Sequence, residues 1–444
     1  MNEYTAYRNK LRTPEQAVQC VKSGDWVDYT GTLGFPPLLD QALAGRRDEL
    51  RDVKIRGNLV FGPIATVECD PSREHFVYHS WHCSDYERRL CDRGLCNYIP
   101  MVFHNLAPYY RHFLKVNVAM LAAAPMDRHG YFNLSCNTGA ARVCLAQADI
   151  VIVEVNERLP RVCGGFGESL HISEVDFVVE GPHPPLPAFD PGTPTPEEEA
   201  IAGHILPWIP DGAVLQLGIG GLPGAVGSLL ARSDLRDLGM HTELCTDAYV
   251  DLYDAGKLTN SRKSLFAGKG VTGIAFGTDK LYHWLNGNPG LAFCPLEYVN
   301  HPRIIGQLEN MISVNECLSV DLFGQVASES AGLRQISGTG GQLDFLLGAA
   351  EARGGRAFLC LPSVYVDKAG GRHSTIVPHF GGEIVTSPRS SVYFIVTEYG
   401  AVNLVGLSTW ERAEKLVSIA HPEYREELIA AAEKMKIWRK SNKR

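Results

Sequence analysis

Short apolar runs alternate with polar, helix-like stretches along the first half of the chain. Continuous Val- and Ile-rich runs of about four to eight residues are typical of strands that are buried on both faces. The strands predicted in this way are 26–30, 53–60, 98–103, 116–122, 150–155 and 175–179. The helices predicted between them are 14–22, 36–44, 108–114 and 140–146. Alternation of this kind predicts an α/β domain.

The second half of the chain repeats the same plan, which predicts a second, similar α/β domain. Its predicted strands are 213–217, 240–243, 271–275, 318–320, 357–361, 383–385 and 392–396. Its predicted helices are 224–230, 247–255, 279–286, 302–308, 344–351, 410–420 and 425–439.

A proline-rich segment separates the two halves. Residues 181–194 contain six prolines, which exclude a regular helix or a central strand. A helix start follows at once, with Thr195 as the N-cap and Glu198 as its reciprocal partner. We therefore predict an N-terminal domain over 1–190 and a C-terminal domain over 191–444.

The composition argues against several classes of protein. The 444 residues are 45% hydrophobic and carry a formal net charge of -8, which argues against a nucleic-acid-binding surface. The first residues lack the apolar core of a secretory signal, and no apolar run is long enough to span a bilayer. We expect a cytoplasmic protein that binds neither nucleic acid nor membrane.

The twelve cysteines include no C-x-x-C pair. His82 and Cys83 lie near Cys91 and Cys96, but their spacing matches no standard zinc pattern. Reduced thiols are the expectation in a chain of this kind, and we predict no metal site.

A glycine-rich turn follows one strand of the second half. The sequence Gly-Ile-Gly-Gly-Leu-Pro-Gly spans 218–224, between an apolar run and a helical pattern. Backbone N–H groups at such a helix start form an anion site, although the same turn also serves as a plain strand-to-helix connection. A proline replaces the third glycine of a dinucleotide fingerprint, and the Gly-Lys-Ser/Thr of a phosphate loop is missing.

Glu243 ends the next predicted strand. A carboxylate beside an anion site can attack an activated acyl group, although carboxylates at strand ends are more often solvated or salt-bridged.

Residues 330–344 hold four glycines and two serines around an arginine, which favours a binding loop over a surface turn. Asn300 precedes a helix that begins with proline, and it either caps that helix or holds a carboxylate or carbonyl in place. Lys368 lies in a polar loop, either solvated or within reach of a phosphate.

Several motifs occur in order along the chain and together support a resemblance. They are Gly-Ile-Gly-Gly-Leu at 218–222, His-Thr-Glu-Leu at 241–244 with Asp247, Glu-Tyr-Val-Asn at 297–300, Gly-Gln-Val at 324–326, Gly-Thr-Gly-Gly-Gln-Leu-Asp-Phe at 338–345, Thr386 with Arg389, and Thr-Glu-Tyr-Gly at 397–400. In these motifs the chain resembles the acetyl-CoA hydrolase/transferase branch of the family I CoA-transferases. The resemblance covers nearly the whole chain and is densest over about 210–420.

The resemblance implies an enzyme with two similar open α/β domains and an active site at their interface. It implies that Glu243 is the nucleophile, that Asn300 positions it, and that Gly341 donates a backbone N–H to the anionic intermediate. The residues that it implies for the coenzyme A site are Gly218, Ile219, Gly220, Gly221, Leu222, Leu318, Gly341 and Lys368. Coenzyme A is then a substrate, with no permanently bound cofactor and no metal. A homo-oligomer is expected on general grounds.

The implied reaction moves coenzyme A between a short-chain acyl-CoA, butyryl-CoA, and acetate through a glutamyl-CoA thioester, in a ping-pong sequence. Transfer to 4-hydroxybutyrate or propionate, and acetyl-CoA hydrolysis, are alternatives on the same fold. The relatives that use 4-hydroxybutyrate tend to have a histidine in a first-domain turn, and residues 31–36 have none. A nucleotide-dependent oxidoreductase and a non-catalytic binding protein are the alternatives from other classes.

Overall fold

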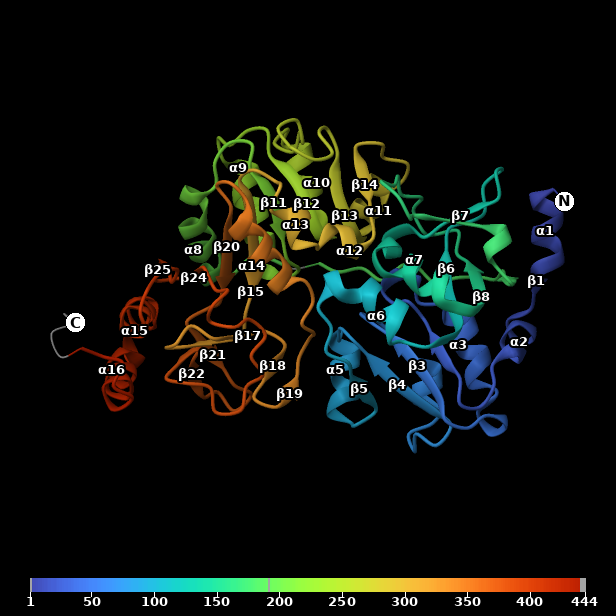
Figure 1. Cartoon of the computed structure of the whole chain (residues 1–444), viewed down its shortest axis with the longest axis horizontal. Coiled ribbons are helices and arrows are strands. Elements are labelled where there is room, and N and C mark those ends of the chain that lie inside the picture. The colour runs from blue at the N-terminus through green and yellow to red at the C-terminus, as the bar shows by residue number, and fades with distance from the viewer. Residues whose placement is uncertain (1, 191, 440–444) are drawn as a thin grey trace. The chain divides into compact units, whose positions relative to one another are not determined.

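The computed structural model describes residues 2–190 and 192–439, which form two compact units (Figure 1). Within the described residues, unit 1 runs to Asp190 and also contains Glu243–Asp247 and Lys269–Val299. Unit 2 holds 192–242, Ala248–Gly268 and the described chain from Asn300 onwards. Parallel sheets with helices in both units confirm the predicted α/β class and the two-domain plan. The division into domains 1–190 and 191–444 stays a prediction.

The first large sheet lies in unit 1 and has eight parallel strands among the described residues. In spatial order they are β1 (Leu11–Arg12), β10 (Phe177–Val179), β8 (Ala148–Val155), β6 (Val116–Ala123), β2 (Trp26–Asp28), β3 (Val53–Gly57), β4 (Phe76–Ser80) and β5 (Cys96–Tyr98). The central strand β6 is almost wholly buried, as expected for a parallel sheet that is covered on both faces.

The second large sheet also has eight strands among the described residues. In spatial order they are β14 (Leu291–Phe293), β13 (Gly270–Ala275), β12 (Gly239–Cys245), β11 (Val214–Leu217), β15 (Met311–Glu316), β20 (Arg356–Cys360), β24 (Phe394–Thr397) and β25 (Gly400–Asn403). Strand β11 pairs in parallel with both β12 and β15, and β24 with β25 forms an antiparallel end.

Smaller sheets complete the strand inventory of the described chain. They are β16 (Ser319–Asp321) with β17 (Val326–Ala327) and β23 (Ile376–Val377), β18 (Ser330–Ala331) with β19 (Arg334–Gln335), β21 (Val364–Val366) with β22 (Arg372–Ser374), and β7 (Tyr131–Asn133) with β9 (Ser169–His171).

The helices pack on the large sheets, α7 against β6 and β8, and α14 against β15 and β20 (Figure 1). Up to residue 190 they are α1 (Glu3–Lys10), α2 (Pro14–Ala17), α3 (Pro37–Ala44), α4 (Ala65–Glu68), α5 (Asp85–Asp92), α6 (Leu106–His112) and α7 (Thr138–Gln147). From residue 192 they are α8 (Pro196–Ile205), α9 (Gly221–Arg232), α10 (Asp247–Asp254), α11 (Asp279–Leu285), α12 (Leu296–Val299), α13 (Pro302–Ile305), α14 (Gln342–Glu351), α15 (Thr409–Ile419) and α16 (Arg425–Lys434). None of the described helices is both long and apolar enough to cross a membrane.

The predicted start of α8 is confirmed. Thr195 accepts from the Glu198 backbone N–H at 3.2 Å, and the Glu198 carboxylate accepts from the Thr195 N–H at 2.7 Å. Two donors that the first turn cannot satisfy within the helix are therefore paired.

Two predicted strands are wrong in whole or in part. Residues 383–385 form no strand, and the Ile384 N–H donates to the Ser330 hydroxyl instead of joining a ladder. The run at 98–103 holds only the last residue of β5, because Pro100 cannot donate to the ladder and a 3₁₀ turn begins at Phe103.

A buried ion pair links two neighbouring strands of the first sheet. Asp28 on β2 lies opposite Arg56 on β3, and their side chains are 1% and 2% exposed. Arg56 Nη1 donates to Asp28 Oδ2 at 3.0 Å, and the Tyr110 hydroxyl donates to the same carboxylate oxygen at 2.7 Å. The guanidinium carbon also lies 4.6 Å from the centre of the Trp26 ring. Each charge of the pair depends on its partner, because removing one residue leaves the other charge uncompensated in the core.

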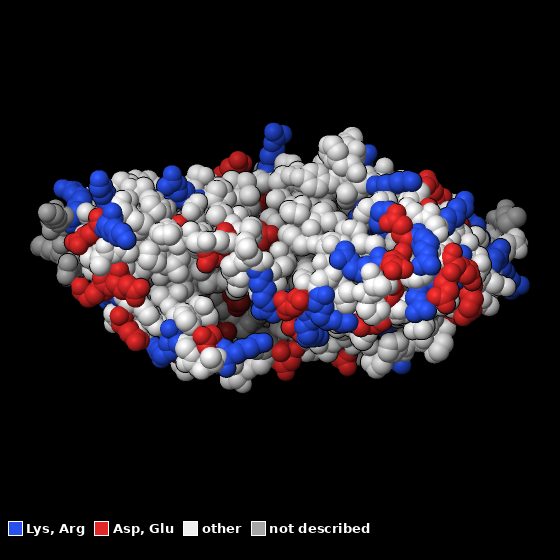
Figure 2. Space-filling model, turned by 90° about the horizontal axis from the view of Figure 1, so that it is seen from below, with Lys and Arg blue, Asp and Glu red and all other residues white. Residues whose placement is uncertain are grey.

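Several ion pairs lie at the surface. The side chains of Arg47 and Asp48, 2.9 Å apart, are 45% and 82% exposed. On the face drawn in Figure 2, basic and acidic side chains are interspersed. Solvent and salt screen pairs of this kind, so they contribute little to stability.

We therefore expect Arg56→Ala to destabilise the protein strongly, by about 3–5 kcal/mol, because Asp28 would be left as a buried charge without its counterion. Urea unfolding followed by circular dichroism measures this change. Arg47→Ala is the matched control and should leave the unfolding midpoint unchanged. Equal midpoints for the two variants would contradict the assigned role of the buried pair.

Candidate active site

Glu243 is the half-buried residue of strand β12, whose other six residues are buried. The Thr272 hydroxyl on β13 donates to the Glu243 carbonyl oxygen at 3.3 Å, which fixes the backbone at this position. Beyond the strand, the Asp247 carboxylate accepts from the Thr278 hydroxyl at 2.6 Å and from the Thr278 N–H at 2.9 Å. The sequence therefore places one half-buried carboxylate near the end of an otherwise buried strand.

The glycine-rich turn connects β11 to α9 in unit 2. Gly220 is the N-cap of α9 with φ +135°, a backbone conformation that favours glycine. A Cβ at Gly220 would lie 2.8 Å from Glu316 Oε1, and one at Gly221 would clash with the Glu198 carboxylate. Gly218 and Gly221 are half-buried, Ile219 is 40% exposed, and Leu222 is buried. The turn thus presents a helix N-terminus that side chains closely surround.

Two carboxylates of unit 2 converge on this helix start. Glu316, the last residue of β15, accepts from the Leu222 N–H through Oε1 at 3.1 Å. Desolvation by the surrounding residues, together with the smaller effect of the Glu198 charge, raises the pKa of Glu316 to about 7, although the Leu222 hydrogen bond acts to lower it. The carboxylate of Glu316 therefore lies at the N-terminus of α9, a position that attracts anions.

Sequence reasoning missed this role of Glu316. Strand β15 was not among the predicted strands, so the position of Glu316 opposite the glycine turn could not be inferred. Glu198 was correctly predicted as a helix cap, but a capping pattern does not show that the same carboxylate faces a turn more than twenty residues further along the chain.

The glycine-rich loop before α14 is held by side chains of unit 2. Gly341 is the N-cap of α14, and its carbonyl accepts from the Phe345 N–H at 3.0 Å. Asp344, in the first turn, is fully buried and accepts from the Asn300 amide at 3.5 Å. The cap of α13 is His301, not Asn300, because the His301 ring accepts from the Arg303 N–H. The structure therefore places the buried Asn300 beside the start of α14, and its predicted role in positioning Glu243 stays a prediction.

Further contacts make this loop rigid. Thr339 donates to the buried Glu329 carboxylate at 3.1 Å, and Gln342 donates to the Ser387 hydroxyl at 2.9 Å. The Thr386 hydroxyl accepts from the Glu329 N–H at 3.1 Å. The segment at 383–387 that forms no strand thus supports the loop at 338–341.

Leu318 and Lys368 lie in connections of unit 2. Leu318 is 37% exposed between β15 and β16, and its N–H donates to the Ala327 carbonyl at 2.9 Å. Lys368 is exposed in the turn between β21 and β22. The Asp367 carboxylate accepts from the Ala369 and Gly371 N–H groups at 2.8 Å, which holds this turn in shape.

The structure brings Asn300 and the start of α14 together within unit 2, with the glycine turn, Leu318 and Lys368 in the same unit. Glu243 belongs to unit 1. The meeting of Glu243 with Asn300 and Gly341, and an active site at the domain interface, stay predictions.

A cavity of about 720 Å³ lies in unit 1 and is lined in part by Arg158, Arg161 and His283. None of the predicted site residues lines it. The carboxylates of Asp127, Glu157 and Asp279 also line this cavity.

The chain matches two family models. Residues 1–190 match the acetyl-CoA hydrolase/transferase N-terminal domain, and residues 277–432 match the corresponding C-terminal domain. The C-terminal match contains Asn300, Leu318, Gly341 and Lys368.

Near-full-length relatives agree with these matches. The chain is 47% identical to the butyryl-CoA:acetate CoA-transferase of Anaerostipes caccae, over 98% of this chain and 99% of that protein. It is 45% identical to a probable butyrate:acetyl-CoA coenzyme A-transferase of Syntrophomonas wolfei, over 98% of each chain.

A solved structure shows the same fold. The crystal structure of RipA from Yersinia pestis superimposes with a TM-score of 0.91 at 37% identity, over 98% of this chain and all of that one. The resemblance drawn from the sequence motifs is confirmed. The chain belongs to the acetyl-CoA hydrolase/transferase family, a family of enzymes.

Proposed function

We propose that this enzyme transfers coenzyme A between butyryl-CoA and acetate, with Glu243 as the residue that carries the transferred groups. Near-full-length similarity to a butyryl-CoA:acetate CoA-transferase carries the proposal. Coenzyme A enters and leaves as a substrate, so the reaction requires no resident cofactor.

The reaction begins when the Glu243 carboxylate attacks the thioester carbonyl of butyryl-CoA. The C–S bond breaks, which gives a butyryl-glutamyl anhydride and the coenzyme A thiolate. The thiolate then attacks the glutamyl carbonyl, which releases butyrate and leaves a glutamyl-CoA thioester. Acetate runs the same steps in reverse and departs as acetyl-CoA. Every attacking and leaving group is an anion, so no proton transfer is needed and no histidine or cysteine base is required.

The oxyanions that form at each carbonyl need donors that are already in place. The start of α14 supplies backbone N–H groups and the positive end of a helix dipole. The contacts of Thr339, Gln342 and Asp344 keep this start rigid before substrate binds. Donors held in this way are each worth about 3–4 kcal/mol of transition-state stabilisation.

The glycine turn at 218–222 is the proposed binding segment for coenzyme A. Gly220 and Gly221 let the backbone of the turn be approached closely, as the Glu316 and Glu198 carboxylates do, and the N–H groups of α9 favour negative charge. Lys368 lies on an exposed turn from which its ammonium group can pair with a phosphate. Binding energy from these remote groups can then be used at the reacting carbonyl.

The purified enzyme should convert butyryl-CoA to acetyl-CoA only when acetate is present. Because the proposed intermediate is a thioester that acetate resolves, free coenzyme A should form far more slowly without acetate than acetyl-CoA forms with it. Chromatography of the CoA esters measures both rates. Equal consumption of butyryl-CoA with and without acetate would show hydrolysis, and no consumption at all would support a binding protein.

Glu243→Gln should lower the transfer rate at least about a thousandfold, because an amide is not a nucleophile toward a thioester. The Kd of coenzyme A, measured by calorimetry, should change little, since the proposed coenzyme A contacts lie in unit 2. Glu427→Gln, an exposed change on α16, is the control and should retain full activity. A Glu243→Gln enzyme with wild-type turnover would rule out the covalent role of Glu243.

Glu316→Gln should strengthen coenzyme A binding at pH 8 by about two- to fivefold, the usual effect of one charge at a helix N-terminus. Since the pKa of Glu316 is raised to about 7, the wild-type carboxylate is mostly neutral at pH 6 and mostly ionised at pH 8. Its repulsion of an anionic ligand therefore grows as the pH rises, whereas glutamine stays neutral. Calorimetry at both pH values gives the difference between the two proteins, in which the ionisation of coenzyme A itself cancels. Identical pH dependence in wild type and variant would contradict a coenzyme A site at this helix start.

A further inference from the structure

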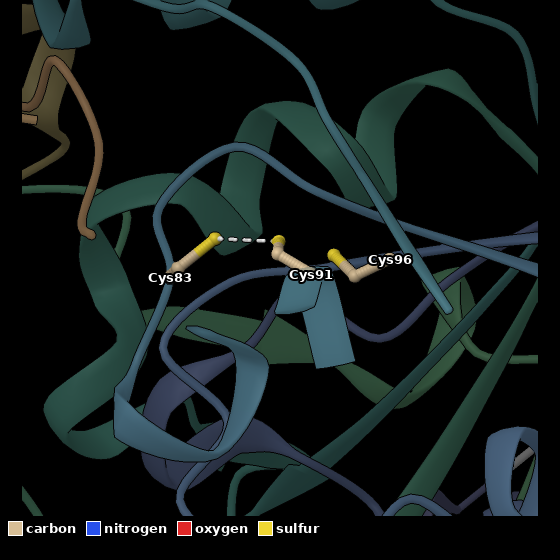
Figure 3. Close-up of side chains that lie close together, drawn as sticks. All are labelled: Cys83, Cys91 and Cys96. Carbon is tan, nitrogen blue, oxygen red and sulfur yellow. Dashed lines mark hydrogen bonds between the residues drawn. The ribbon is translucent and has the colours of Figure 1, made fainter. Parts of the chain in front are cut away.

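Three cysteine thiols of unit 1 lie together at one edge of the first sheet (Figure 3). Cys83 lies in the connection between β4 and α5, Cys91 in the last turn of α5, and Cys96 at the start of the edge strand β5. Their sulfur atoms all lie within 4.8 Å of one another, and the Cys83 and Cys91 sulfurs are 3.8 Å apart. The sequence spacing alone argued against a metal site, but the turn between α5 and β5 brings the three thiols to one point.

The separation of the sulfur atoms suits a tetrahedral metal ion. A Zn–S bond of about 2.3 Å places two thiolates on a tetrahedral ion about 3.8 Å apart. The Cys83–Cys91 distance has this value already, and Cys96 needs to move by at most about 1 Å to match it.

The backbone that carries the thiols is fixed. Ser84 and Glu87 form a capping box at the start of α5, next to Cys83. The buried Glu87 carboxylate also accepts from the Tyr78 hydroxyl at 2.7 Å and from the Val60 N–H at 3.1 Å. At the other end of the helix, the Gly94 N–H donates to the Cys91 carbonyl at 3.0 Å. Because these bonds hold each cysteine in place without a ligand, binding an ion costs little ordering entropy.

The burial of the three thiols and the charge of three thiolates favour binding of a divalent cation that prefers sulfur ligands. Cys83 and Cys96 are 3% and 8% exposed, and Cys91 is half-buried. Three thiolates within 4.8 Å of one another need a compensating positive charge, and Zn²⁺ compensates more of it than Cu⁺ does. Thiolate ligands also exclude the hard cations Mg²⁺ and Ca²⁺.

We propose that Cys83, Cys91 and Cys96 bind one Zn²⁺ ion through three thiolates and that the ion ties α5 to the edge strand β5. Each thiol loses its proton to solvent as it binds. Within the described residues, no further histidine, cysteine or carboxylate atom joins this group, and His82 lies outside it. A water molecule therefore supplies the fourth ligand. The site is separate from the proposed transfer chemistry, and its effect is on the stability of unit 1.

The test starts from full-length protein purified with a reductant and dialysed. Plasma mass spectrometry should find about one zinc ion per chain in the wild type, as expected for a preformed thiolate site. Cys91→Ser should lose that ion, whereas the matched control Cys163→Ser, a half-buried cysteine of the same unit outside the cluster, should keep it. Zinc should raise the unfolding temperature of the wild type and the control by several degrees and leave that of Cys91→Ser unchanged.

A second measurement does not depend on the variants. Cobalt added to metal-free wild type should give one equivalent of a thiolate-to-cobalt charge-transfer absorption that zinc then removes. Absence of this absorption, together with no zinc-dependent change in unfolding temperature, would overturn the proposal. A native disulfide between Cys83 and Cys91 in protein that takes up no metal would overturn it as well and would identify a redox pair.

Discussion

In a parallel sheet that is covered on both faces, a charged side chain must either be compensated in the core, as in the Asp28–Arg56 pair, or lie near a strand end, and this constraint organises the candidate site. Strand β12 is buried at six of its seven positions, and Glu243 is the half-buried one. The same constraint puts the glycine turn after β11 and Glu316 at the end of β15, since both strands run parallel beside each other. Ligand-binding groups gather at strand ends, because a charge in the interior of the sheet must be compensated there.

The two carboxylates of interest differ in what surrounds them. Glu316 lies near a second acid, Glu198, and desolvation by the surrounding residues raises its pKa to about 7, although a helix N–H stabilises its charge. A nucleophile has the opposite requirement, because it must stay ionised to attack a thioester. We propose Glu243, the half-buried residue of β12, for that role.

The fold class could be predicted from the sequence because continuous runs of Val and Ile mostly indicate buried strands. Strands without such runs were missed: β4 alternates buried and half-buried side chains, and β15 ends in polar residues. The apolar residues at 383–385 predicted a strand, but tertiary contacts hold them as an irregular support for the loop before α14. Glu243 as the proposed nucleophile, Asn300 and the glycine loops were predicted from motifs that can be recognised in the sequence alone. The convergence of Glu316 on α9 and of three cysteines at one edge depends on folding, and spacing along the chain does not encode it.

The central claim is that Glu243 becomes covalently linked to coenzyme A. The direct test is incubation with butyryl-CoA, reduction with sodium borohydride, and peptide mapping by mass spectrometry. The account predicts that the Glu243 side chain is reduced to an alcohol, with loss of activity, and only after exposure to the acyl-CoA, because borohydride reduces a glutamyl thioester but not a carboxylate. An unmodified Glu243 in an enzyme that still consumes butyryl-CoA would contradict the account and leave direct hydrolysis as the explanation.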